Sequence, residues 1–131
     1  MYQNYHEFYR GQVYYATLEQ AFGHEQGGTR PVLILQNDVG NYYSPTVIVT
    51  AATMQKKNKV FMRTHVRLTD VEGLPTESVF MLEIIRTIDK RRIRNYAGKL
   101  TPEQMEKIDA ALRVSLRLSE EDFLHTEMEA P

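Results

Sequence analysis

The chain has 131 residues, of which 42% are apolar and 25% charged, and it contains no cysteine. These proportions are those of one soluble folded domain, and the missing cysteine excludes disulfides, thiol catalysis and thiolate zinc sites. No apolar stretch approaches roughly 18 residues and the N-terminus lacks a signal-peptide core, so we expect no membrane span and a cytoplasmic location. The net charge of −1 hides a mildly basic body, because residues 120–131 carry five acids and neither lysine nor arginine.

The first two thirds of the chain read as short strands separated by turns. Residues 18–30 contain three glycines and predict a loop, and residues 37–45 combine Asn, Asp, Gly and Pro and predict a turn. The continuous apolar run 31–36 is typical of a strand buried on both faces. Five segments have strand composition: residues 11–17, 31–36, 46–53, 60–69 and 78–83.

The last third of the chain changes to a helical period. Thr101 is expected as the N-cap, Pro102 as the first helical residue, and Gln104 as the partner that completes a capping box. The helix should run to about Leu118 and lie across the sheet with one apolar face: Met105, Ile108, Leu112 and Leu116. Together these elements predict an α+β fold, a small twisted antiparallel barrel closed by one helix, in a single domain over residues 1–131 with probable extensions at 1–9 and 120–131.

Several kinds of active site have no support in the sequence. The four histidines are scattered without a second ligand at helical or strand spacing, so no metal site is predicted. The segment GHEQGG matches neither phosphate-binding glycine motif, and no G-x-S-x-G turn is present. We therefore expect no cofactor.

Arg30 stands between a glycine pair and a rigid strand. Gly27 and Gly28 allow positive φ and a close approach of a ligand, while Pro31 biases Arg30 toward an extended backbone. An arginine held in this way suits a phosphate group, since its planar guanidinium pairs with two oxygens. A surface arginine that merely begins a strand has the same spacing, and the spacing alone leaves both interpretations open.

Successive blocks of the chain resemble the MazF/PemK toxin family. They are RGQVYYATL (10–18), EQGGTRPVLILQND (25–38), SPTVIVTAAT (44–53), THV (64–66) and SVFMLEIIRTIDKRRI (78–93). The resemblance implies an SH3-like barrel with a C-terminal helix that forms homodimers. It also implies a sequence-specific, metal-independent and ribosome-independent endoribonuclease. Such an enzyme cuts single-stranded RNA to leave a 2′,3′-cyclic phosphate and a 5′-hydroxyl, and an acidic, partly disordered antitoxin neutralises it and forms a DNA-binding complex with it.

The resemblance also implies the catalytic residues. It places Arg30 and Thr53 at the scissile phosphate, where the ribose 2′-OH is an internal nucleophile and the protein has to stabilise the charge of the phosphorane. His24 stands where close relatives carry a serine, and it either assists proton transfer or contacts phosphate. An exposed loop histidine remains the alternative for His24.

Further RNA contacts are expected in the loops and strands around this centre. Ile84 replaces a glutamine of the relatives, so their cleavage motif should not be transferred to this chain. The cations of the 54–63 loop either follow the RNA backbone or are ordinary solvated side chains. The expected contacts are Glu25, Gln26, Gly27, Gly28, Lys56, Lys57, Arg63, His65, Ile84 and Arg86.

The basic run from Arg86 to Arg94 suggests salt bridges at a dimer interface, with Asp89 as a natural partner, or contacts to the antitoxin. Two other functions stay open: a CcdB-like, non-enzymatic poison of DNA gyrase, and an inactive RNA-binding relative. The GGTRP segment, Thr53 and the absence of tryptophan favour the nuclease over the gyrase poison.

Overall fold

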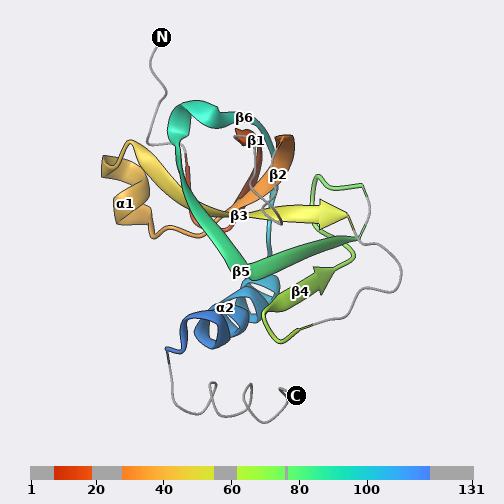
Figure 1. The fold of residues 1–131 in the computed structure, drawn as a ribbon. Helices are drawn as coiled ribbons and strands as arrows, with labels where there is room; N and C mark the ends of the chain where they lie inside the picture. The colour runs from red at the N-terminus through yellow and green to blue at the C-terminus, as the bar shows by residue number, and fades with distance from the viewer. Residues whose placement is uncertain (1–7, 19–27, 55–61, 76, 119–131) are drawn as a thin grey trace.

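The protein is built on one six-stranded antiparallel sheet with a C-terminal helix on one side (Figure 1). The structure is a computed structural model and describes residues 8–18, 28–54, 62–75 and 77–118. Along the sheet the strands follow the order β4-β5-β3-β2-β1-β6. The strands are β1 (Gln12–Leu18), β2 (Gly28–Ile34), β3 (Thr46–Met54), β4 (His65–Leu68), β5 (Ser78–Asp89) and β6 (Ile93–Lys99). The helices are α1 (Asp38–Tyr43), the 3₁₀ turn η2 (Lys90–Arg92) and α2 (Pro102–Leu116).

The predicted α+β class is confirmed, but the sheet is not a closed barrel. Its two edges are β4 and β6, and the described residues of these strands do not pair with one another. The long strand β5 bends where its register against β3 shifts between Thr50 and Ala52, and this bend curls the sheet (Figure 1). A barrel-like shape therefore arises from curvature without a closed hydrogen-bond ring.

A turn of the β4–β5 connection packs against β6, the edge strand that does not pair with β4. Gly73 has φ +86°, and a Cβ atom on it would overlap the carbonyl oxygen of Ala97. A Cβ atom on Gly98 would likewise overlap the carbonyl of Glu72. The backbone N–H of Lys99 donates a 3.2 Å hydrogen bond to Glu72 Oε1. The two backbones thus approach as closely as only glycine allows.

The strand β2 explains why the sequence has a continuous apolar run there. Val32 and Ile34 belong to the apolar cluster on one face of the sheet, and Leu33 and Leu35 belong to the cluster on the other face, beside α2. Side chains alternate between faces along a strand, so a strand covered on both sides has to be apolar at every position. Burial on both faces is confirmed.

The predicted helix is confirmed, including its capping box. Gln104 N–H donates to Thr101 Oγ1 at 3.1 Å, and Thr101 N–H donates to Gln104 Oε1 at 2.8 Å. Ile108 is fully buried against the sheet, whereas Leu116, expected on the same apolar face, is 50% exposed. The helix ends at Leu116, two residues before the predicted end, because Arg117 takes a left-handed conformation.

Four other element predictions need correction. The 37–45 turn contains helix α1, whose N-cap Asn37 accepts a hydrogen bond from Gly40 N–H. Of the strand expected over 60–69, the described part, 62–69, is a strand only at His65–Leu68. The strand expected over 78–83 continues to Asp89, and β2 begins three residues before Pro31. Strand β6 was not predicted, because most of its residues are exposed and it carries no apolar alternation.

The extensions expected at residues 1–9 and 120–131 lie outside the described residues except for Phe8 and Tyr9. Phe8 is 6% exposed and packs in the same cluster as Val32 and Ile34. The single-domain organisation over residues 1–131 stays a prediction. Within the part of the chain that the structure describes, no helix is long and apolar enough to cross a bilayer.

The contact between the 72–73 turn and β6 predicts a large effect of Gly73→Ala. The variant combines a positive φ with a direct backbone overlap, and we expect it to lose about 3 kcal/mol or more of its free energy of unfolding. Gly28→Ala is the matched control. Gly28 also has positive φ (+79°), but its Cβ position meets no described atom within 4 Å, so only about 1–2 kcal/mol should be lost. Equal losses in urea denaturation would contradict this packing.

Candidate functional site

The register of β2 against β3, extended beyond its last pair, would bring the two predicted catalytic residues together. Val32 pairs with Ala51 and Ile34 pairs with Val49. The last pair of these two strands is Val32–Ala51, and the same register extended by two residues would place Arg30 across from Thr53 on the same face. Opposite residues of an antiparallel pair have Cβ atoms about 4.5–5.5 Å apart. In that register Arg30 and Thr53 would be within reach of one small group such as a phosphate.

Arg30 is held by its strand neighbours. It pairs with Ala16 of β1, and the following residues Val32, Leu33 and Ile34 are fully buried. The extended backbone expected for Arg30 is confirmed, as is the positive φ of Gly28. Open space beside Gly28 leaves room for a ligand to approach the start of β2.

Thr50, which was not predicted from the sequence as a site residue, hydrogen-bonds the irregular part of β5. The buried hydroxyl of Thr50 donates to the carbonyl oxygens of Met81 at 3.2 Å and Ile84 at 3.0 Å. These carbonyls belong to the irregular part of β5, between the pairs Thr50–Ile85 and Thr53–Val79. Ile84 is thus half-buried in a bulge whose backbone is already hydrogen-bonded. A β-branched residue in a strand gives no sequence signal for this role.

His65 is tied to a carboxylate on β5. Its Nε2 lies 2.9 Å from Glu83 Oε2, and the hydroxyl of Thr64 donates to Glu83 Oε1 at 2.6 Å. Burial alone would raise the pKa of Glu83, but the hydrogen bonds from Thr64 and His65 lower it below its ordinary value. The Met62 backbone N–H also faces the second ring nitrogen of His65, Nδ1, at 3.5 Å. Both ring nitrogens of His65 therefore face protein groups.

The remaining predicted contacts divide into three groups. Arg63 is exposed in the turn before β4. Arg86 pairs with Val49, four residues along β3 from Thr53, which corresponds to about 13 Å of strand. Within one chain the structure does not bring Arg86 to the Arg30–Thr53 pair. Six predicted residues lie outside the described part of the chain: His24, Glu25, Gln26, Gly27, Lys56 and Lys57.

The basic run after β5 is largely occupied by contacts within the chain. Arg91 pairs with Asp89 at 3.0 Å, and its hydrogen bonds hold the pKa of Asp89 at about 2. Lys90, expected among the cations available to a partner, is instead fully buried. Its ammonium donates to the carbonyl of Asn41 and lies 5.8 Å from the centre of the Phe8 ring, and burial lowers its pKa. Lys90 thus joins η2 to α1.

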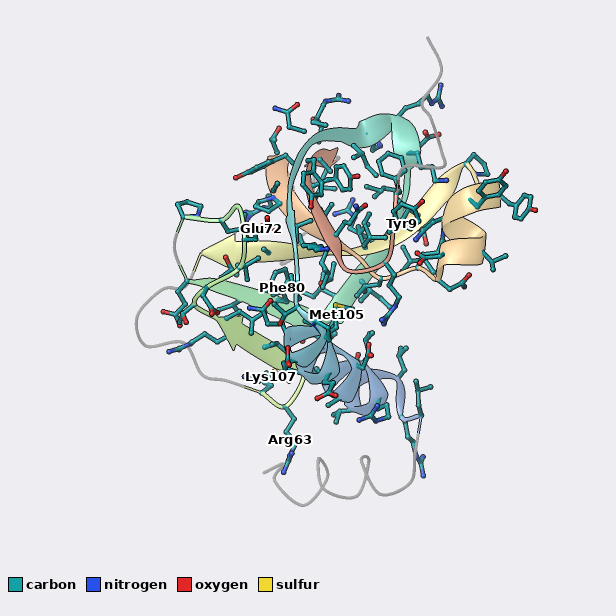
Figure 2. All side chains as sticks on the ribbon, turned by 180° about the vertical axis from the view of Figure 1, so that it is seen from behind. Tyr9, Arg63, Glu72, Phe80, Met105 and Lys107 are labelled. Carbon is teal, nitrogen blue, oxygen red and sulfur yellow. The ribbon has the colours of Figure 1, made fainter. Side chains whose placement is uncertain are left out.

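A separate cleft lies elsewhere among the described residues. It has a volume of about 660 Å³ and is lined by residues before β1, after β4 and at the start of α2, among them Tyr9, Glu72 and Met105 (Figure 2). None of the predicted site residues that the structure describes lines it. The volume of this cleft would therefore not have identified Arg30 and Thr53 as site residues.

The lowered pKa of Glu83 predicts a pH dependence of stability. A carboxyl whose folded-state pKa is depressed stabilises the fold above its unfolded pKa, and this contribution is lost as the pH falls through the folded-state value. Acidification from pH 6 to pH 3 should therefore reduce the free energy of unfolding less in Glu83→Gln than in the wild type. Thr64→Val, which removes one of the two hydrogen bonds, should lie between them. Parallel pH curves for all three proteins in denaturant titrations would rule out this role of Glu83.

Comparison with known proteins agrees with this geometry. Residues 9–116 match the family model described as the PemK-like, MazF-like toxin of type II toxin–antitoxin systems. Over 110 residues the chain is 49% identical to endoribonuclease EndoA of Bacillus subtilis (strain 168). The matched region covers 83% of this chain and 94% of the relative.

Solved structures show the same fold. A mycobacterial endoribonuclease in complex with its cognate antitoxin matches with a TM-score of 0.68 at 28% identity, over 85% of this chain and 96% of the other. MazF from Deinococcus radiodurans matches with a TM-score of 0.69 at 22% identity, over 83% and 96% of the two chains, and supports the fold alone. The chain therefore belongs to the PemK-like, MazF-like toxin family of type II toxin–antitoxin systems.

Proposed function

We propose that this chain, an endoribonuclease of the PemK/MazF family, cuts single-stranded RNA at short sequence motifs through Arg30 and Thr53. The proposal rests on the β2–β3 register, whose continuation beyond the Val32–Ala51 pair would set Arg30 opposite Thr53, with both residues half-buried. The 49% identity to an endoribonuclease favours this activity over a CcdB-like gyrase poison and over an inactive relative.

The proposed chemistry uses the substrate's own nucleophile. The ribose 2′-oxygen attacks the neighbouring phosphorus, the bond from phosphorus to the 5′-oxygen breaks, and the products are a 2′,3′-cyclic phosphate and a 5′-hydroxyl. One proton leaves the 2′-OH and one is delivered to the 5′-oxygen. Arg30 donates two N–H groups to the phosphorane oxygens, and the Thr53 hydroxyl donates to a non-bridging oxygen. Neither a protein nucleophile nor a metal ion is required for these steps.

Proton transfer calls for a further group, because a guanidinium with a pKa above about 12 is a poor base at neutral pH. His24 lies outside the described residues, so its part in this transfer stays a prediction. A pH–rate profile of wild type and His24→Ser tests it. The wild type should show a limb in the histidine range that is absent from the variant, and identical profiles would remove His24 from the mechanism.

Recognition of the RNA sequence should differ from that of relatives with a glutamine at position 84. Ile84 offers no side-chain hydrogen bond to a base edge, and its backbone carbonyl is taken by Thr50. Base selection then rests on apolar contact with Ile84. The other predicted RNA contacts that the structure describes are Gly28, Arg63, His65 and Arg86. Lys56 and Lys57 are proposed to follow the RNA backbone.

The proposed setting is a cytoplasmic toxin–antitoxin pair. A mycobacterial relative is known in complex with its cognate antitoxin, which supports an antitoxin partner for this chain. We propose that this antitoxin is acidic and partly disordered. We extend the proposal to a homodimer in a single-domain form, with DNA bound only through the antitoxin complex. Arg86, remote from Thr53 within one chain, is proposed to contact RNA at a site shared between two protomers.

The proposed chemistry predicts that Arg30→Ala lowers kcat by about 10²–10³, the usual cost of losing a donor to a developing oxyanion. Thr53→Val, which keeps the shape and removes the hydroxyl, should also lower kcat, whereas Thr53→Ser should retain most of it. The measurement is cleavage of a long unstructured RNA in EDTA, with 5′-hydroxyl ends mapped.

The outcomes separate the candidate functions. Discrete cuts that vanish in Arg30→Ala support the nuclease and its site. Intact RNA with inhibited gyrase would establish the CcdB-like alternative, and bound but uncut RNA the inactive one. An Arg30→Ala variant within tenfold of the wild type would contradict the role of Arg30.

A further inference from the structure

A basic pocket lies at the open edge of the sheet, between β4 and α2. It has a volume of about 350 Å³ and is lined by four side chains that are or can become cations: Arg63, His65, Arg67 and Lys107. None of the described residues that line it is acidic. Figure 2 shows Lys107 on α2 beside β4, with Arg63 on the same side of the molecule.

The pocket adjoins the cross-strand row that contains the proposed catalytic pair. Thr53 of β3 pairs with Val79 of β5, and Val79 in turn pairs with Arg67 of β4. Neighbouring strands lie about 4.8 Å apart, so the backbones of Thr53 and Arg67 are separated by about 10 Å. The row lies on the face of the sheet opposite α2, because Val66 and Leu68 on either side of Arg67 pack in the cluster beside the helix. A strand of RNA that follows this row past Thr53 reaches the β4 edge and would turn around it to meet Lys107.

Two of the four residues, Arg67 and His65, are held by carboxylates. Arg67 Nε lies 2.6 Å from Glu77 Oε2, and His65 is fixed by Glu83. Lys107 stands on the exposed side of the middle of α2. Val66, Ala110 and Val114 form an apolar wall, and a low-dielectric wall strengthens the field of the charges beside it.

A second arginine cluster differs from the β4–α2 pocket because an acidic residue lines it. Its small pocket, lined by Arg91, Arg92 and Arg94, also contains Asp89, which pairs with Arg91. Asp89 lies in that pocket itself, whereas Glu77 and Glu83, which pair with Arg67 and His65, do not line the β4–α2 pocket. An added anion would therefore meet no described carboxylate in the lining of the β4–α2 pocket.

We propose that the β4–α2 pocket is a second phosphate subsite, which binds a phosphodiester of the RNA strand beyond the scissile bond through Lys107, Arg67 and Arg63. The inference rests on the proposed nuclease function and extends its RNA site onto the helix. Phosphate contacts of this kind position the strand and are independent of base sequence. The subsite thus contributes to the binding of long RNA and not to base selection.

The test compares Lys107→Ala and Lys107→Glu with the wild type. RNA with one 2′-deoxy nucleotide at the cut position cannot be cleaved, so its dissociation constant reports binding alone. Lys107→Ala should weaken binding several-fold for every sequence tried and reduce the slope of log K against log salt by roughly 1. The charge reversal should reduce both further, and the cleavage defect should lie in KM.

Lys99→Ala is the matched control, because Lys99 is an exposed lysine on β6 outside this pocket. Its salt slope and dissociation constant should equal those of the wild type. A second control is an RNA trimmed to the cleavage motif, on which Lys107→Ala should bind as the wild type does. Equal defects in Lys99→Ala and Lys107→Ala, or an unchanged salt slope in Lys107→Ala, would overturn the subsite.

Two further outcomes are distinct. If Lys107→Ala binds RNA normally but loses affinity for a polyglutamate peptide, the pocket serves an acidic protein segment and the RNA subsite is wrong. If the wild type binds the uncleavable RNA with the predicted Lys107 dependence yet cuts no RNA, the proposed nuclease function fails while the phosphate subsite stands.

Discussion

The structure depends on the burial of β2 on both of its faces. Val32, Leu33 and Ile34 have no exposed surface, and the strand lies between β1 and β3 in the middle of the sheet. A strand packed on both faces and paired on both sides cannot shift without losing two apolar clusters at once. Arg30 continues this strand toward solvent, so the rigidity of the core sets where the guanidinium begins. The proposed chemistry needs this rigidity, because stabilisation of a phosphorane relies on donors that are already in place.

Charge in this protein is distributed between structural and available cations. Lys90 is buried and fastens η2 to α1, and Arg91 is paired with Asp89. Arg10 plays a similar part, since it donates to the carbonyl of Leu35 at 2.8 Å and pairs with Asp109 of α2 at 2.6 Å. A count of basic residues therefore overstates the surface that a polyanion meets. The RNA surface that we propose is the narrower set along the row from Arg30 to the β4 edge.

The sequence predicted those features in which local chemistry and tertiary packing agree. The apolar run of β2 and the capping box at Thr101 each have one physical interpretation, and both are confirmed. Strand β6 escaped prediction because pairing with β1, and not an apolar pattern, makes it a strand. The bulge held by Thr50 and the anchoring of His65 by Glu83 also escaped, because they depend on contacts more than fifteen residues apart in the chain. The resemblance of motifs named Arg30 and Thr53, and their catalytic role stays a prediction that the β2–β3 register supports when it is extended beyond Val32–Ala51.

The most direct measurement is the cleavage rate of the double variant Arg30→Ala/Thr53→Val against the two single variants. If both side chains act on one phosphorane, the second substitution should cost much less in the variant that already lacks the first. A combined loss far smaller than the product of the two single losses is the expected result. Losses that multiply fully would show that Arg30 and Thr53 act independently, and would contradict a shared site set by the β2–β3 register.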